Sequence, residues 1–302
     1  MLSWLPSPVQ GTILLTLLVL NTLFWCFFLF LLVILKVVVP VQSFRRWISL
    51  GLTWIAQSWA ACNSLAVKHL LDVRWDVRLP EGIDPNGQYL ACANHRSWND
   101  IVALMFAFGR RAPFFKFFLK QELIWVPILG VAWWALDYPF MKRFSREEIE
   151  RNPALKGKDM ETTRKACEKF IDQPVMVLNF LEGSRFTPAK HAAQQSPFQH
   201  LLKPKSGGLA FATAAFGERV NSLVNITIAY PSGTGGLWSL LSGQVKEVVV
   251  HAEAITIPHE FYDGDYENDS EFRTRYQAWV SGLWTQKDQQ IGQILATYEA
   301  AK

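Results

Sequence analysis

The chain has 302 residues, which is enough for one large domain or two ordinary ones and for a sizeable buried core. Its net charge is only +4, with 30 Lys and Arg against 26 Asp and Glu scattered along the sequence, and this balance argues against nucleic-acid binding. Half of the residues are hydrophobic, including 13 Trp and 21 Phe, which is high for a soluble protein.

The first 35 residues contain no charged side chain, and residues 11–35 are mostly Leu, Val, Ile and Phe. An apolar run of about 25 residues is long enough to cross a bilayer with some tilt. It is too long for the core of a signal peptide, and no charged residue precedes it. The sequence therefore predicts a retained membrane helix, with a buried helix of a soluble domain as the alternative.

Basic residues follow this segment at Lys36, Arg45 and Arg46, and none precedes it. The positive-inside rule then places the rest of the chain in the cytoplasm, at the inner membrane if the source is bacterial. Residues 47–67 are also uncharged but are rich in Trp and broken by polar side chains, which favours an interfacial helix over a second span. We expect residues 1–70 to anchor the chain to a membrane.

From residue 71 the pattern becomes that of a globular domain, which we expect to extend to residue 302. Strands are predicted over residues 73–79, 88–93, 174–180, 223–230 and 245–255, and helices over 101–108, 209–216 and 271–297. Strands that alternate with helices indicate an α/β domain. The aromatic runs between residues 114 and 134 are interrupted by charges, so we expect a surface that rests on lipid and not a further span.

The strand predicted at residues 88–93 leads into a histidine and an aspartate five positions apart, His95 and Asp100. Such a pair is a candidate general base with its orienting carboxylate. On one continuous helix five residues turn the chain by about 500°, which separates the two side chains. They can meet only if His95 lies in a loop and Asp100 in the first turn of a helix that Ser97 caps. The alternative is a surface histidine and a capping aspartate that never touch.

A second candidate segment, Glu182-Gly183-Ser184-Arg185, follows the strand predicted at residues 174–180. A glycine turn after a buried strand can hold the adjacent arginine in a cleft, where a guanidinium binds phosphate with two parallel hydrogen bonds. An ordinary turn with an exposed arginine is the alternative.

Two further basic pairs, Lys142-Arg143 and Lys203-Pro204-Lys205, supply cations to an anionic ligand or lie on a solvated surface. The four cysteines lack the spacing of metal ligands or of a disulfide framework, so no metal site is predicted. The sequence contains no G-x-S-x-G nucleophile elbow, no P-loop and no H-E-x-x-H motif.

In this order, these segments resemble the PlsC-type lysophospholipid acyltransferases, the 1-acylglycerol-3-phosphate acyltransferase family, over roughly residues 72–256. The family's N-H-x-x-x-x-D block is matched by Asn94, His95 and Asp100, its apolar block ending in Arg looks like Gly130 through Arg143, and its E-G-[TS]-R block is matched by Glu182 through Arg185. The fourth block, a strand that usually carries a proline, departs from this pattern because Pro231 follows the strand. The form Thr-Ile-Ala-Tyr-Pro is similar to the branch that contains lysocardiolipin-type enzymes.

The resemblance implies a mixed central sheet flanked by helices, and direct acyl transfer to the free hydroxyl of a lysophospholipid, with lysophosphatidic acid as the first guess. The acyl donor would be a thioester of CoA or of acyl carrier protein, and no cofactor or metal is needed. The implied partners are the phospholipid membrane and these two substrates, without nucleic acid.

The resemblance also implies roles for single residues. His95 would be the general base and Asp100 its orienting carboxylate. Arg185 would hold the lysolipid phosphate and Glu182 would fix its turn. The rest of the substrate site would comprise Gly183, Ser184, Arg143 and Lys205.

Two other classes of protein stay open. A lipid hydrolase could use the same histidine–aspartate pair with water and would need no thioester. A non-enzymatic membrane lipid binder would keep the apolar surface and tolerate the loss of His95.

Overall fold

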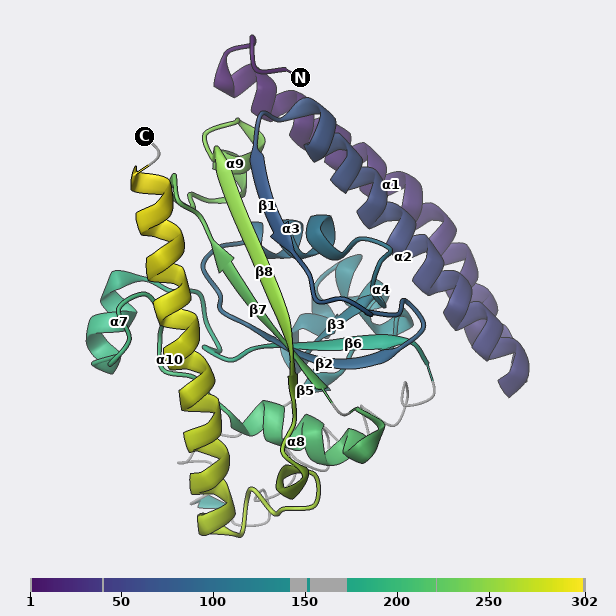
Figure 1. The fold of residues 1–302 in the computed structure, drawn as a ribbon. Coiled ribbons are helices and arrows are strands. Elements are labelled where there is room, and N and C mark those ends of the chain that lie inside the picture. Colours follow the sequence, from purple (N-terminus) through teal and green to yellow (C-terminus); the bar gives the residue numbers. More distant parts are fainter. Residues whose placement is uncertain (1, 40, 142–150, 153–172, 221, 301–302) are drawn as a thin grey trace.

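A six-stranded mixed sheet forms the centre of the molecule, with the strand order β1-β8-β7-β2-β6-β3 (Figure 1). All neighbouring strands are parallel except β7 and β8. The strands are β1 (Arg74–Arg78), β2 (Gln88–Ala93), β3 (Phe115–Phe117), β6 (Val175–Phe180), β7 (Ser222–Ala229) and β8 (Glu247–Thr256).

The computed structural model describes residues 2–39, 41–141, 151–152, 173–220 and 222–300. Within these ranges the α-helices are α1 (Ser7–Val38), α2 (Gln42–Leu70), α3 (Asn99–Phe108), α4 (Leu129–Ala135), α7 (Pro188–Gln194), α8 (Gly207–Phe216), α9 (Leu237–Leu241) and α10 (Ser270–Ala300). Short 3-10 helices are η1 (Gln121–Trp125), η3 (Gly217–Arg219) and η4 (His259–Phe261), and a small second sheet pairs β4 (Leu119–Lys120) with β5 (Phe140–Met141).

The predicted fold class, a mixed sheet flanked by helices and preceded by N-terminal helices, is confirmed. Each of the five predicted strands is present, with ends that differ by at most two residues. The aromatic segment after residue 113 contributes an edge strand, β3, that the sequence did not predict. The domain boundary at residue 71 stays a prediction.

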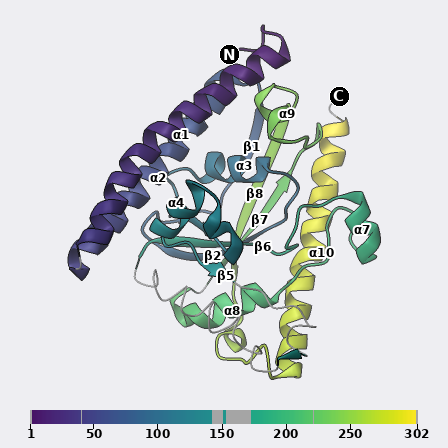
Figure 2. The same cartoon turned by 180° about the vertical axis from the view of Figure 1, so that it is seen from behind.

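Alternate residues of the central strands enter two separate cores, because successive side chains of a strand point to opposite faces of the sheet. In β2, Leu90 and Cys92 lie on the face covered by α8 and α10. Ala91 and Ala93 lie on the other face, which packs against α3 and the end of α2. Figures 1 and 2 show the resulting layers, with α10 on one side of the sheet and the pair of α1 and α2 on the other.

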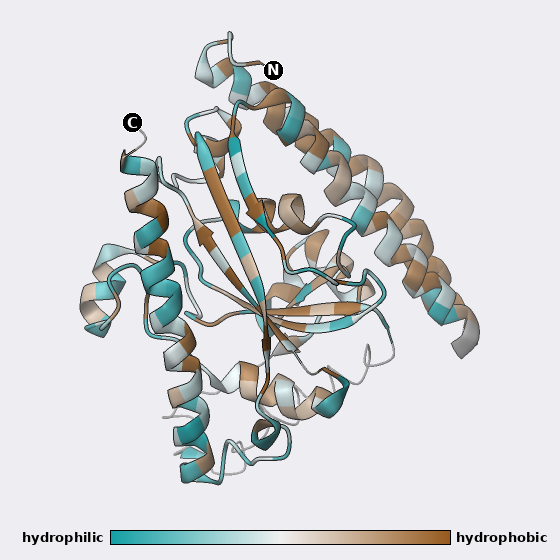
Figure 3. Ribbon diagram, viewed as in Figure 1, coloured by the Kyte–Doolittle hydropathy of each residue, from teal (hydrophilic) through white to brown (hydrophobic). Residues whose placement is uncertain are grey.

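The first two helices run side by side as an antiparallel pair (Figure 2). Polar side chains join them at mid-length: Asn21 Nδ2 donates to Asn63 Oδ1 at 2.7 Å, and Trp59 Nε1 donates to Thr22 Oγ1 at 3.0 Å. Among the described helices, α1 alone is long and apolar enough to cross a membrane by length and composition. In Figure 3 the ribbon of α1 is coloured mainly as hydrophobic, whereas that of α10, on the opposite side of the sheet, carries many hydrophilic residues.

Both ends of α1 contact the globular domain. Near its start, a side chain at Gly11 would come within 3.0 Å of Trp238 and 3.1 Å of Ser242, so glycine permits the close approach to α9. At its other end, Lys36 Nζ pairs with Asp137 Oδ2 at 3.0 Å and donates to the Ala135 carbonyl at 2.8 Å. Lys36 is therefore an internal ion-pair partner. The positive-inside prediction counted it as a free cation flanking the helix, and the structure does not support that interpretation.

Candidate active site

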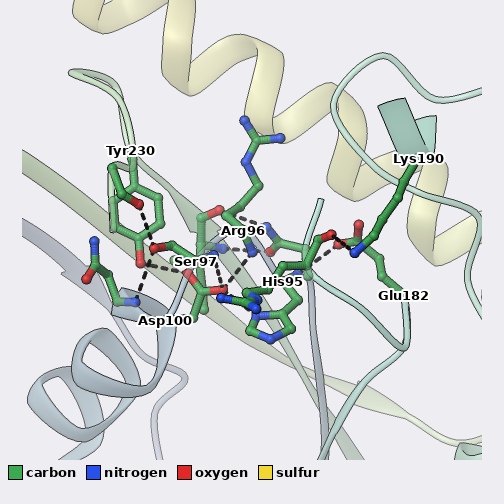
Figure 4. Close-up of polar contacts among 12 residues, drawn as sticks. His95, Arg96, Ser97, Asp100, Glu182, Lys190 and Tyr230 are labelled. Carbon is green, nitrogen blue, oxygen red and sulfur yellow. Dashed lines mark hydrogen bonds and ion pairs between the residues drawn. The ribbon is translucent and has the colours of Figure 1, made fainter. Parts of the chain in front are cut away.

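The candidate residues gather at the carboxyl ends of three neighbouring parallel strands, β2, β6 and β7. Ala93 is in register with Phe180 of β6 and with Ile226 of β7. The segments that follow these three positions therefore meet at one edge of the sheet, where α/β proteins commonly bind their ligands. Figure 4 shows the side chains of this edge converging on His95 and Asp100.

His95 and Asp100 meet as their spacing predicted. His95 lies in the loop after β2, and its Nδ1 is 2.7 Å from Oδ2 of Asp100 in the first turn of α3. Asp100 is fully buried, whereas the His95 side chain is 18% exposed. A carboxylate that accepts from Nδ1–H leaves the lone pair on Nε2, the nitrogen that can take a proton from a substrate.

Asp100 is itself held by donors on every side. Its Oδ2 accepts from the backbone N–H groups of Arg96 and Ser97 at 2.6 and 3.0 Å. Its Oδ1 accepts from the Tyr230 hydroxyl at 2.7 Å. Burial, with Asp100 acting in the same direction, raises the pKa of Tyr230 well above its usual range, so the phenol stays a donor. These three donors and His95 Nδ1–H thus fix the orientation of the carboxylate.

The role predicted for Ser97 was wrong. Helix α3 begins at Asn99 with Trp98 at the N-cap position. The Ser97 hydroxyl donates to the Gly235 carbonyl at 2.9 Å, and it accepts only a long hydrogen bond of 3.3 Å from Asn99 N–H. The turn before α3 is instead stabilised by Asp100, a residue of the helix itself, whose carboxylate accepts the Ser97 N–H.

Two aromatic rings and one amide fix the surroundings of His95. Its imidazole stacks on the Phe180 ring at 4.1 Å between centroids, and Phe117 of β3 stacks on the far side of Phe180 at 6.0 Å. The side-chain amide of Asn94 pairs with β7 as the backbone of a strand residue would. Its Nδ2 donates to the Ile228 carbonyl at 2.9 Å, and its Oδ1 accepts from the Ile228 N–H at 2.8 Å. Asn94 therefore extends the pairing of β2 with β7 to the residue before the histidine.

Glu182 is buried and joins two chain segments. Its Oε1 accepts from the His95 backbone N–H at 2.8 Å, and its Oε2 accepts from the Leu202 N–H at 3.0 Å. Burial raises the pKa of Glu182 to about 7, although these two hydrogen bonds and the charge of Arg96 act in the opposite direction. The carboxylate thus orients the backbone of His95, beyond the turn-fixing role that the resemblance implied.

The raised pKa of Glu182 predicts a pH-dependent contribution to stability. Between pH 4.5 and 7 the folded chain holds a proton that the unfolded chain releases, so stability decreases as pH rises through this window and is level above it. Each pKa unit corresponds to about 1.4 kcal/mol. We expect Glu182→Gln to remove this slope, measured by tryptophan fluorescence during thermal unfolding in detergent. Parallel Tm profiles for the two proteins would contradict the assignment.

The other predicted binding residues surround this centre at its exposed rim. Gly183 adopts φ +65°, and the methylenes of Lys205 lie against it, where a side chain would meet Lys205 Cδ at 3.2 Å. Ser184 is half-buried, and Arg185 and Lys205 are exposed. Arg143 lies outside the described residues.

Arg185 is held by an aromatic contact and not by an ion pair. Its guanidinium lies 4.6 Å above the ring of Trp98, which is 61% exposed beside the histidine loop. Its carbonyl accepts from Lys190 Nζ at 3.1 Å. Among the residues that the structure describes, no carboxylate pairs with Arg185, so the guanidinium keeps its charge available for an anion.

Sequence reasoning missed four side chains of this centre: Tyr230, Arg96, Trp98 and Phe180. Tyr230 and Phe180 end or follow strands whose carboxyl ends share the edge with β2, and that position was the signal that could have found them. Arg96 Nη1 donates to the His200 carbonyl at 2.8 Å, and its guanidinium lies 4.4 Å above the Phe186 ring. In the described part of the chain, no group of three or more His, Cys, Asp or Glu side chains is placed to hold a metal ion.

The mixed sheet carries a half-buried histidine on a buried aspartate at the carboxyl ends of its parallel strands, an arrangement able to accept a proton. The sequence model of the family described as Acyltransferase matches residues 74–230. The chain belongs to this acyltransferase family.

Individual relatives agree with this assignment. The chain is 25% identical to the 2-acyl-1-lysophosphatidylinositol acyltransferase of Saccharomyces cerevisiae over 66% of its own length and 59% of that protein. It is 27% identical to the mouse (Mus musculus) 1-acyl-sn-glycerol-3-phosphate acyltransferase gamma over 38% of its own length and 30% of that protein. The chain thus matches less than two thirds of the length of these curated relatives.

One solved structure has the same fold. The 1-acyl-sn-glycerophosphate (LPA) acyltransferase PlsC of Thermotoga maritima superposes with a TM-score of 0.50 over 92% of this chain and 97% of that one. The sequence identity is 15%, so this likeness concerns the fold alone.

Proposed function

We propose that this protein is a membrane-bound acyltransferase that moves a fatty acyl group from a thioester to the free hydroxyl of a lysophospholipid. The observation that carries the proposal is the 2.7 Å contact between His95 Nδ1 and the buried Asp100 in a chain of the acyltransferase family. The contact leaves Nε2 of a half-buried imidazole able to accept a proton at the carboxyl edge of the sheet.

In the proposed reaction His95 Nε2 takes the proton of the acceptor hydroxyl while its oxygen attacks the thioester carbonyl. The new C–O ester bond forms, the C–S bond breaks, and the imidazolium returns the proton to the departing thiolate. Asp100 stabilises the imidazolium between these two steps. Because the acyl group passes directly to the acceptor, no acyl-enzyme and no metal enter the scheme.

The acceptor proposed first is lysophosphatidic acid. Mouse and yeast relatives are named for acceptors that differ in headgroup, 1-acyl-sn-glycerol-3-phosphate and lysophosphatidylinositol, and both carry a phosphate. Arg185, Lys205 and Arg143 are the residues proposed to bind that phosphate, with Gly183 and Ser184 forming the turn. The donor is proposed to be acyl-CoA or acyl carrier protein thioester.

The experiment supplies membranes that contain the full chain with labelled acyl-CoA and, separately, lysophosphatidic acid, lysophosphatidylinositol, lysophosphatidylglycerol and lysophosphatidylethanolamine. Labelled two-chain phospholipid is the expected product, with the highest kcat/KM for lysophosphatidic acid. Free fatty acid released from lipid without a thioester would identify a hydrolase instead. Binding of lipid without any product would identify a lipid-binding protein.

Replacing Arg185 by alanine is expected mainly to raise the KM for the acceptor, because a phosphate contact present throughout binding contributes equally to ground and transition states. Lysine should restore binding only in part, since it lacks the bidentate fork. Trp98→Ala should act in the same direction, as its ring supports the guanidinium at 4.6 Å. Arg219→Ala, a change of an exposed arginine in η3, is the control. A change confined to the donor KM would contradict the role.

We further propose that the outer faces of α1 and α2, with η1 and α4, form the membrane-contacting surface. Large apolar side chains are exposed there, among them Phe27, Ile34, Trp47, Trp54, Trp125 and Trp134. A helix that crosses a bilayer ends on opposite membrane surfaces about 30 Å apart. Because both ends of α1 contact one globular domain, we favour an arrangement along the membrane over the predicted crossing, with the active site on the cytoplasmic side.

A chain without residues 1–40 is expected to stay partly bound to membranes. Its remaining anchors are the exposed tryptophans of α2 and the apolar surface of η1 and α4, where Trp125 is 85% exposed. Fractionation of membranes, followed by size-exclusion chromatography, measures the bound share against that of the full chain. A fully soluble and monodisperse product would show that α1 alone anchors the protein.

A further inference from the structure

The C-terminal helix α10 contacts the active site through a short loop, residues 199–202. Asp288 of α10 accepts the backbone N–H of Gln199 at 2.8 Å and that of His200 at 2.7 Å, one on each carboxylate oxygen. One turn earlier, the buried Trp284 donates from Nε1 to the Leu202 carbonyl at 3.1 Å. Helix α10 lies outside residues 74–230, the part of the chain that the family model matches.

The same loop also forms hydrogen bonds with two residues next to His95, one adjacent in sequence and one that contacts its backbone. The His200 carbonyl accepts from Arg96 Nη1 at 2.8 Å, and Arg96 is the residue that follows His95. The Leu202 N–H donates to Glu182, whose other oxygen accepts the backbone N–H of His95. The 199–202 loop therefore connects α10 to Arg96 and to Glu182, the two residues next to the histidine.

Asp288 is suited to fix this loop because its bonds are charge-assisted. The 199–202 loop has no regular secondary structure, so its N–H groups need partners outside a helix or sheet. Hydrogen bonds from two adjacent N–H groups to one carboxylate are shorter and stronger than hydrogen bonds to a neutral acceptor. Among the described residues Asp288 makes its hydrogen bonds to the loop and none to His95, so we expect its effect on the reaction to pass through the loop.

We propose that Asp288 is a positioning residue for the acyl transfer. It fixes the 199–202 loop and, through the loop, orients Arg96, Glu182 and the backbone of His95. The inference rests on the proposed function, because it assigns Asp288 a place in the geometry of that same reaction. The C-terminal helix is then a part of the catalytic apparatus, with Trp284 as its second attachment.

The test compares Asp288→Asn with the wild type in the full chain. Asparagine keeps the size of the side chain but presents an N–H group to one of the two donors. We expect kcat to fall by about tenfold while the KM of donor and acceptor changes by less than about twofold, since misplacement of a base affects the chemical step more than binding.

Two variants on the same helix are controls. Glu299→Gln changes an exposed carboxylate near the end of α10. Tyr276→Phe removes a buried hydrogen bond of 3.0 Å to Thr213, so it weakens the docking of α10 away from the loop. Both should keep kcat within about twofold of the wild type. A loss of kcat in Tyr276→Phe equal to that in Asp288→Asn would overturn the proposal in favour of a general stabilising role.

A double-mutant cycle tests the route through Glu182. If Asp288 acts through the 199–202 loop, Asp288→Asn should cost little further activity in a Glu182→Gln background, because residues of one network are not additive. Additive losses would exclude this route.

Hydrogen exchange gives a readout that does not depend on activity. Peptides that contain residues 94–97 should exchange faster in Asp288→Asn, and also in Trp284→Phe, which keeps the aromatic bulk but loses the indole N–H. Unchanged exchange in both variants would refute the proposal even if kcat fell. If the wild type transfers no acyl group to any lysolipid, the proposed function has failed, and the exchange result still decides whether α10 orders the loop.

Discussion

Turnover is expected to fall by about 100-fold or more when alanine replaces His95, because the acceptor hydroxyl of the proposed reaction then loses its general base. At the carboxyl edge of the sheet, His95 donates from Nδ1 to Asp100, and this leaves the lone pair on Nε2. The acceptor KM should change little, since the imidazole contributes to proton transfer and not to phosphate binding.

The measurement varies the acceptor at a fixed, saturating concentration of the donor, on membranes with matched amounts of protein. His259→Ala is the control, because His259 is exposed and pairs with Glu218 at 2.6 Å near the amino end of β7, opposite the carboxyl end that faces the histidine loop. Membrane association should be equal in all three proteins. Near-normal turnover in a folded His95→Ala variant would end the general-base assignment.

Asparagine in place of Asp100 is expected to lower turnover by about 100-fold or more, close to the effect of losing the histidine itself. The buried carboxylate accepts from His95, from the N–H groups of Arg96 and Ser97, and from the Tyr230 hydroxyl. An amide that turns its NH₂ group toward any of these donors loses at least one bond, and it no longer favours the Nδ1–H tautomer or stabilises the imidazolium.

Tyr230→Phe separates the two functions of Asp100. This change removes the donor at Oδ1 and leaves the contact of Oδ2 with His95 in place, so we expect a loss of about tenfold at most. Kinetics of the two variants, with circular dichroism to check folding, provide the comparison. Turnover of Asp100→Asn within tenfold of the wild type would mean that His95 acts without its carboxylate.

The sequence predicted the histidine–aspartate contact because that contact is local. Five residues that pass from a strand end into a helix leave few ways to arrange two polar side chains, and the observed loop is the one that joins them. The Glu182 contacts could not be predicted in this way. They connect backbone groups that lie 87 and 20 residues away, and no periodicity in the sequence encodes such pairings.

Strand β3 shows a second limit of local patterns. Lys116 interrupts its aromatic residues and led to a prediction of a lipid-facing surface, yet its side chain is buried. Burial lowers the pKa of Lys116 to about 8, and the charge of Asp137 acts against that shift. Asp137 lies later in the chain than β3, so a local pattern around Lys116 does not reveal the nearby charge or that β3 completes the sheet.

The attachment of α1 at both of its ends has a consequence for how substrate arrives. Gly11 against Trp238 and Lys36 against Asp137 attach the two ends of the helix directly to the globular domain. If α1 lies in the lipid, the depth of His95 below the headgroups is set once, by the fold. The lysolipid acceptor that we propose then reaches the histidine by lateral diffusion within its own leaflet, and the search for substrate becomes two-dimensional.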